Sequence, residues 1–115
     1  MTELKKLPAF FYATPSGKEP VREWLQGLDD NDRQRIGQDI ATAEFGWPLG
    51  MPLCRNLGRG LWEIRSDISD KRIARVIFSP VKGRMVLLHG FVKKTQKTPK
   101  PELDLAAKRL KEINS

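Results

Sequence analysis

The sequence predicts a single α+β domain, in which two helices precede and one helix follows a strand-rich segment of the chain. Three observations lead to this prediction. Apolar residues recur at helical spacing in the first half of the chain. In the second half, three runs alternate apolar with other residues, and apolar residues recur at helical spacing again near the C-terminus. With 115 residues, the range 1–115 is expected to form one domain, because domains of roughly 100–150 residues hold one core. The expected architecture is a four-stranded antiparallel or mixed sheet, two N-terminal helices on one face, and a C-terminal helix.

The first half contributes one strand and both N-terminal helices. A strand is expected over 7–14, an aromatic-rich run that ends in a Pro-Ser-Gly turn. A helix should begin near Pro20, which suits the first turn of a helix, and a second helix should end at Gly46. The apolar stripes of the two helices are Val21, Trp24, Leu25 and Leu28, then Ile36, Ile40 and Ala43. Residues 46–60, rich in glycine and proline, are expected to form a loop.

The second half contributes the other three strands, over 61–66, 72–79 and 84–92. The connections between them are too short for a parallel crossover, so the strands should form antiparallel hairpins. From about Pro101, apolar residues again fall at helical spacing and predict the C-terminal helix.

Alternation along these strands sorts their side chains between the two faces of the sheet. One face is uniformly apolar and should pack on the N-terminal helices. It carries Trp62, Ile64, Ala74, Val76, Phe78, Val86, Leu88, Gly90 and Val92. The other face is mixed. If no bulge resets the register, it gathers Glu63, Arg65, Arg75, His89, Phe91 and Lys93, with Lys94 at the strand end.

The positive charge of the protein is concentrated in this strand-rich half. The net charge is +7, yet residues 1–60 carry eight basic and eight acidic side chains, whereas residues 61–115 carry thirteen and six. Such a concentration attracts phosphates and favours RNA binding, although a solvated surface is the alternative. The expected RNA contacts outside the catalytic set are Lys82, Arg84, Phe91, Lys94 and Lys97.

Cysteine and histidine counts exclude some chemistry. Cys54 is the only cysteine and His89 the only histidine, so one chain can form neither a disulfide nor a Cys/His zinc cluster. We expect no metal and no cofactor. No apolar run approaches the roughly 20 residues that span a bilayer, and the N-terminus lacks the apolar stretch of a signal peptide. A cytoplasmic protein without a membrane partner is therefore expected.

Each residue of the mixed face also has a plain structural interpretation. A strand arginine can form a surface ion pair of little energetic value, His89 can be a half-buried polar residue, and Phe91 can pack under the last helix. What favours a site is convergence. Two interior-strand arginines beside lysines are costly on a partly apolar surface without an anionic partner.

Three segments carry a resemblance to a known family: GLWEIR at 60–65, RVIF at 75–78, and above all LLHGFVKKTQKTP at 87–99. Over residues 8–113 the chain resembles the RelE/HigB superfamily of bacterial toxins, specifically its phage-derived HigB-like branch. The resemblance implies a RelE-like fold and the toxin of a type II toxin–antitoxin system. Such toxins are mRNA interferases that cut messages, usually on the ribosome, without metal and by attack of the ribose 2′-OH. It also implies a HigA-like helix-turn-helix antitoxin as partner, with operator DNA bound only through that antitoxin.

The resemblance also implies roles for individual residues. Arg65 and Arg75 would hold the scissile phosphate, since guanidinium geometry suits two phosphate oxygens. Lys93 would add positive potential or move a proton, and His89 would serve as acid or base. RelE has a tyrosine near the end of its last strand, where this chain has Phe91, which cannot transfer a proton.

Two other functions fit the same residues. One is a non-catalytic RNA- or ribosome-binding module that uses the basic face. The other is an inert phage-derived protein whose basic face only docks a partner.

Overall fold

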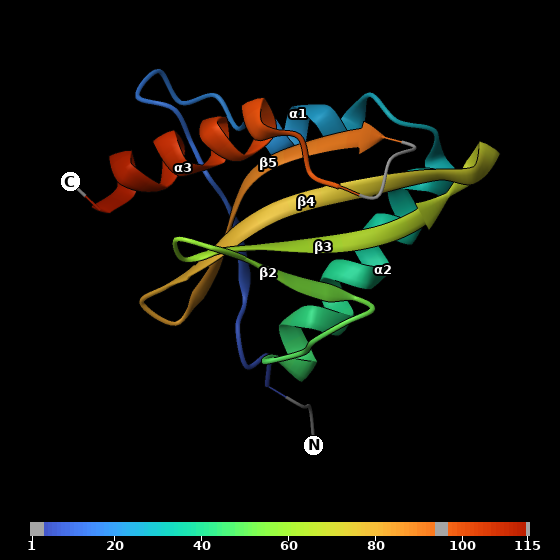
Figure 1. Cartoon of the computed structure of the whole chain (residues 1–115), viewed down its shortest axis with the longest axis horizontal. Helices are drawn as coiled ribbons and strands as arrows, with labels where there is room; N and C mark the ends of the chain where they lie inside the picture. Colours follow the sequence, from blue (N-terminus) through green and yellow to red (C-terminus); the bar gives the residue numbers. More distant parts are fainter. Residues whose placement is uncertain (1–3, 94–96, 115) are drawn as a thin grey trace.

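The computed structural model describes residues 4–93 and 97–114 and is an α+β structure built on a five-stranded mixed sheet (Figure 1). In chain order the elements are β1 Ala9–Phe11, α1 Pro20–Gln26, α2 Asp30–Gly46, β2 Cys54–Gly58, β3 Leu61–Ile68, the short 3-10 helix η1 Ser69–Lys71, β4 Arg72–Val81, β5 Arg84–Lys93 and α3 Lys100–Asn114. The strand order across the sheet is β1-β5-β4-β3-β2. Only β1 pairs in parallel, with β5, and the other neighbours are antiparallel.

The sheet has five strands where four were expected. The additional strand, β2, lies inside the segment 46–60, which was wrongly expected to be a loop throughout. β2 forms a hairpin with β3, and its turn is made by Gly58, Arg59 and Gly60, all of which have positive φ. Glycine adopts such φ values without steric cost, so two of the four glycines that suggested a loop, Gly58 and Gly60, belong to a tight turn.

One face of the sheet is covered by α1 and α2, as expected from the two apolar stripes. The core on this helical face joins the helix residues Val21, Ile36, Ile40 and Ala43 to the strand residues Ile64, Ala74, Val76, Phe78, Met85 and Leu87. Trp47 adds an aromatic cluster, because its ring lies edge-on to Trp62 at 4.9 Å and to Phe78 at 5.4 Å. This face therefore holds the main hydrophobic core.

A bulge in β5 corrects the expected face assignment. Ile77 lies opposite His89, but Phe78 lies opposite Leu87, which leaves Leu88 as an extra residue. The inserted residue reverses the alternation between the bulge and the β4–β5 turn. Val86 and Leu88 therefore face α3, and not α1 and α2 as expected. Beyond the bulge the expected alternation holds, and His89 stays on the same face as the residues of β3 and β4 that were grouped with it.

The other face of the sheet is covered in part by α3, which runs across β4 and β5 (Figure 1). A second, smaller core lies there and contains Tyr12, Leu61, Ile77, Val86, Leu88, Phe91 and Ala106. The mixed face is thus partly covered by α3, in agreement with the interpretation that Phe91 packs under the last helix. In the part of the chain that the structure describes, no helix has the length and apolar character needed to cross a bilayer.

Candidate functional site

The side of the sheet that faces α3 carries charged residues in three cross-strand rows, which we call the polar face. The first row is Arg55, Glu63, Ile77 and His89; the second is Arg65, Arg75 and Phe91; the third is Asp67, Ile73 and Lys93. Neighbours within a row are about 5 Å apart, since this is the spacing of paired strands. The pairing thus brings together five of the sequence-predicted residues: Arg65, Arg75, His89, Phe91 and Lys93.

Arg75 lies at the centre of the polar face and is completely buried, as is Glu63. The Nη1 of Arg75 donates a hydrogen bond to Oγ1 of Thr98 at 3.2 Å, and that hydroxyl donates to Oε2 of Glu63 at 2.7 Å. Thr98, which precedes α3, therefore links the two charges and covers them. Arg75 was expected to hold a phosphate directly, but in this conformation solvent does not reach it.

The electrostatics of Arg75 reflect this burial. Desolvation lowers the pKa of its guanidinium from the usual value, and the facing Glu63 carboxylate opposes that shift. The neighbouring cations Arg65 and Arg55 add to the lowering of the pKa. Arginine keeps its proton at neutral pH even so, and the group is a fixed positive charge beneath the surface.

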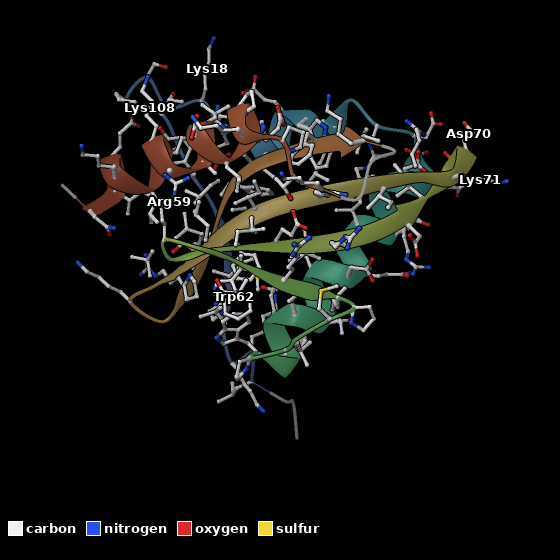
Figure 2. The ribbon with its side chains drawn as sticks, in the orientation of Figure 1. Lys18, Arg59, Trp62, Asp70, Lys71 and Lys108 are labelled. Atoms are coloured by element: carbon white, nitrogen blue, oxygen red, sulfur yellow. The ribbon has the colours of Figure 1, made fainter. Side chains whose placement is uncertain are left out.

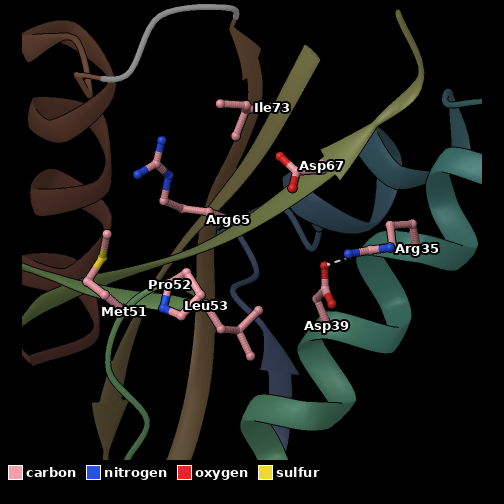
Figure 3. Close-up of a pocket in the computed structure, with 8 residues that line it drawn as sticks. All are labelled: Arg35, Asp39, Met51, Pro52, Leu53, Arg65, Asp67 and Ile73. Atoms are coloured by element: carbon pink, nitrogen blue, oxygen red, sulfur yellow. Dashed lines mark hydrogen bonds and ion pairs between the residues drawn. The ribbon is translucent and has the colours of Figure 1, made fainter. Parts of the chain in front are cut away.

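Arg65 is the more accessible arginine of the second row. Its backbone N–H donates to the carbonyl of Leu53 at 2.9 Å, and its Nε lies 4.0 Å from Oε1 of Glu63. The side chain is 14% exposed and lines a cavity of about 300 Å³ at the edge of the sheet (Figure 3). Arg65 is therefore the arginine of the second row that reaches a cavity.

His89 and Phe91 lie under the first turns of α3. The Nε2 of His89 is 2.9 Å from Oε2 of Glu102, and the imidazole ring stacks on Phe91 with centroids 5.6 Å apart. Phe91 is buried in the second core, which agrees with the packing interpretation and not with an exposed platform for bases. His89 has the half-buried environment that was its plain structural interpretation, with a carboxylate to orient its ring.

The predicted lysines are not all in one place. Lys93 is exposed at the end of β5, in the row of Asp67, and Lys97 is exposed beside Arg55. Lys94 lies outside the described residues.

Lys82 and Arg84 are separate from the polar face. Lys82 lies in the β4–β5 turn and Arg84 directly follows that turn, at the opposite end of β5 from Lys93. The guanidinium of Arg84 lies over the ring of Phe10 at 4.8 Å. A strand rises about 3.3 Å per residue, so roughly 30 Å separates Arg84 from Lys93. The structure does not bring these two expected RNA contacts to the polar face.

Four polar residues of the site were missed from the sequence, and one of them is Asp67, which lies in β3 beyond the expected strand 61–66. Arg55 lies on the unexpected strand β2, and Thr98 and Glu102 come from the segment that enters α3. The acidic residue in the first turn of a helix is a recognisable signal, but only the packing of α3 shows that Glu102 meets His89.

The acidic residues and Cys54 bear on two other chemistries, metal binding and thiol catalysis. Among the described residues no three His, Cys, Asp or Glu side chains are grouped as metal ligands. Cys54 is buried, and burial raises the pKa of its thiol to about 11, with a smaller contribution from the Asp39 charge. A thiol with that pKa is a poor nucleophile at neutral pH.

Comparison with known families places most of the chain in one family. A family model described as phage-derived protein Gp49-like (DUF891) matches residues 23–111, from α1 to α3. The chain belongs to this family. The Gp49-like family is a RelE/HigB-like toxin family, associated with the toxins of toxin–antitoxin systems. The match includes all three rows of the polar face and most of α3, which covers them in part. No curated protein matches this Gp49-like chain in sequence.

Proposed function

We propose that this Gp49-like protein is the toxin of a type II toxin–antitoxin system, of the HigB-like branch, and that it cuts mRNA on the ribosome. The observation that carries the proposal is the pairing of Arg65 with Arg75 across β3 and β4, beside Lys93 and His89, in a member of a toxin family. Adjacent guanidinium groups on rigid strands are suited to a phosphate that gains charge in a transition state.

In the proposed reaction the ribose 2′-oxygen attacks the adjacent phosphorus and loses its proton. The bond to the 5′-oxygen of the next nucleotide breaks, and that oxygen takes up a proton, which leaves a 2′,3′-cyclic phosphate and a 5′-hydroxyl. Arg65 and Lys93 meet the phosphate from the exposed side, and buried Arg75 adds positive potential from below. His89, held by Glu102, carries a proton, since an imidazole ring has one nitrogen that can accept a proton and one that can donate it.

The proposed partners follow from the same function. The substrate is mRNA on the ribosome, and the neutralising partner is a HigA-like helix-turn-helix antitoxin, through which alone the complex would contact operator DNA. A neighbouring gene for such a protein would support this proposal.

Induction of the protein alone tests the activity. We expect growth arrest and new message 5′ ends that disappear when translation is blocked. Arg65→Ala should reduce the cuts at least about a hundredfold, as expected for loss of one transition-state contact. Arg22→Ala, an exposed arginine of α1 paired only with Glu19 among the described residues, should cut as the wild type does. Normal growth and intact messages in cells that hold folded, soluble wild-type protein would contradict the proposal.

A non-catalytic RNA- or ribosome-binding module is the second candidate, and the burial of Arg75 favours it. Arg75→Lys, which retains the charge but not the guanidinium fork, separates the two functions. In an enzyme, message cutting should fall much more than RNA affinity. In a binding module, growth inhibition and RNA affinity should fall together and no cuts should appear.

A further inference from the structure

The cavity that Arg65 lines extends beyond the polar face, around the edge of β3. Eight residues form its walls: Arg35 and Asp39 of α2, Met51, Pro52 and Leu53 before β2, Arg65 and Asp67 of β3, and Ile73 of β4 (Figure 3). Its volume of about 300 Å³ is at the lower end of the range for small-molecule sites. It can hold one ring system and not a large ligand.

The walls of this cavity are apolar on two sides. Met51, Pro52 and Leu53 lie on one side and Ile73 on the other, and Met51 is 61% exposed at the rim. Flat bases of single-stranded RNA are held between apolar or planar side chains, and methionine adapts its shape to such a surface. The shape of the cavity therefore favours an unstacked nucleobase.

The polar groups of the cavity supply both acceptors and donors. Asp39 is paired with Arg35, its Oδ2 lying 3.3 Å from Nε, whereas Asp67 forms none of the ion pairs found among the described residues. A carboxylate accepts hydrogen bonds only, so the Asp67 carboxylate selects a base edge with N–H donors. Guanine presents two adjacent donors, N1–H and the N2 amino group, which the two oxygens of one carboxylate can accept together.

The cavity adjoins the second row of the polar face, because Arg65 belongs to both. Arg65 and Asp67 are two residues apart on the same face of β3, a separation of about 7 Å. That distance is comparable to the span from the phosphate to the base within a nucleotide. A phosphate at Arg65 thus leaves its own base within reach of Asp67.

We propose that this cavity is a base-recognition subsite that takes a guanine next to the phosphate held by Arg65, with Asp67 as its specificity-determining residue. The assignment to RNA rests on the proposed function. Binding of a guanine nucleotide does not depend on cleavage and can be measured by itself.

Nucleotide titration of the full-length protein, followed by NMR, tests the subsite directly. GMP should bind about tenfold more tightly than AMP, CMP or UMP, a preference in the range for one bidentate base contact. Asp67→Asn should abolish this preference, because an amide replaces one acceptor with a donor. Asp70→Asn is the matched control: Asp70 is an exposed carboxylate at the nearby β3–β4 hairpin, outside the cavity, and the variant should keep the preference (Figure 2).

Mapping the message cuts of the same variants separates this inference from the proposed function. Asp67→Asn should still cut, but without a preference for guanine beside the cut. Equal binding of the four nucleotides, or an unchanged preference in Asp67→Asn, would overturn the subsite even if the wild type cuts messages. Binding of a partner peptide in the cavity with no nucleotide binding would overturn it too. Selective GMP binding by a protein that makes no cuts would retain the subsite and refute the proposed function.

Discussion

On the side of α1 and α2, strands β3 and β4 bury Ile64, Val76 and Phe78, whereas on the side of α3 the same two strands bury Glu63 and Arg75. Removing a charged side chain from water costs free energy, whereas burying an apolar side chain does not. Buried ion pairs are therefore often no more stabilising than apolar residues of the same size. The helical face is thus organised for stability. The polar face retains charges at a cost, which is consistent with a role in binding an anion.

Buried acids on the helical side lie at its rim and have a different role. Glu44 accepts a hydrogen bond from the backbone N–H of Ala9 at 2.7 Å and pairs with Lys5, and Asp32 accepts one from the backbone N–H of Ser69 at 3.1 Å. These carboxylates fix the chain. The carboxylate of Glu63 instead faces the side chains of Thr98 and Arg65. Substitutions on the two faces should therefore differ in which property they change.

The largest loss of stability is expected from Phe78→Ala on the helical face. Phe78 is completely buried, and removing a buried phenyl ring typically costs about 3–5 kcal/mol of unfolding free energy. Urea unfolding measures the loss. Phe10→Ala is the control, because Phe10 is 47% exposed and contacts the Arg84 guanidinium, so less than about 1 kcal/mol should be lost. A similar loss in both variants would contradict the assignment of the main core to this face.

A smaller loss is expected where β5 touches α1. A Cβ at Gly90 would lie 2.3 Å from Cε3 of Trp24, and the rigid indole must move to admit it. Gly90→Ala should therefore cost about 2–3 kcal/mol of unfolding free energy. In α2, a Cβ at Gly37 would meet no atom within 4 Å, so Gly37→Ala should stabilise the protein by about 0.5–1 kcal/mol. Thermal unfolding distinguishes the two, and a stabilised Gly90→Ala variant would refute the close packing of α1 on the sheet.

Thr98→Val tests the polar face with a change of little volume. It removes the hydroxyl that accepts from Arg75 and donates to Glu63, and the expected cost is about 1–2 kcal/mol of unfolding free energy. Thr98→Ser retains the hydroxyl and should lose much less. Equal stability of Thr98→Val and the wild type in urea would show that the buried charges do not depend on this link, and the contrast between the two faces would weaken.

The faces also differ in how well the sequence predicted them. Around the two arginines, at 62–65 in β3 and 74–76 in β4, apolar and polar residues alternate, and this pattern correctly placed Arg65 and Arg75 on one face. Residues 85–88 are apolar at every position, so the pattern carries no information on their orientation, and the one-residue bulge at Leu88 reversed them.

The side-chain links between the polar face and the segment around the start of α3 could not be predicted from local patterns. Thr98 and Glu102 are separated from Glu63 and His89 by many residues in the chain, and only the packing of α3 unites them. The burial of Arg75 has the same origin. A basic residue in a strand suggests a surface position, and the helix that covers it is set by apolar residues elsewhere, such as Ala106.

The smallest effect is a pH dependence at the rim of the helical face. The backbone N–H of Ser69, with further contributions from its hydroxyl and from Arg72, holds the pKa of Asp32 below its usual 3.8. The unfolded chain therefore binds a proton at Asp32 more readily than the folded chain. The stabilisation is complete above about pH 5, and it is lost as the pH falls through the lowered pKa.

Urea unfolding of Asp32→Asn between pH 7 and pH 3 tests this assignment. The variant should be less stable than the wild type at pH 7, and the difference should shrink toward pH 3, because the wild-type carboxylate becomes protonated while the amide does not titrate. Asp70→Asn, an exposed neighbour on the same turn, should follow the wild type over the whole range. A difference in unfolding free energy that is the same at every pH would contradict this assignment. It would mean that the shape of Asp32 stabilises the fold and that its charge does not.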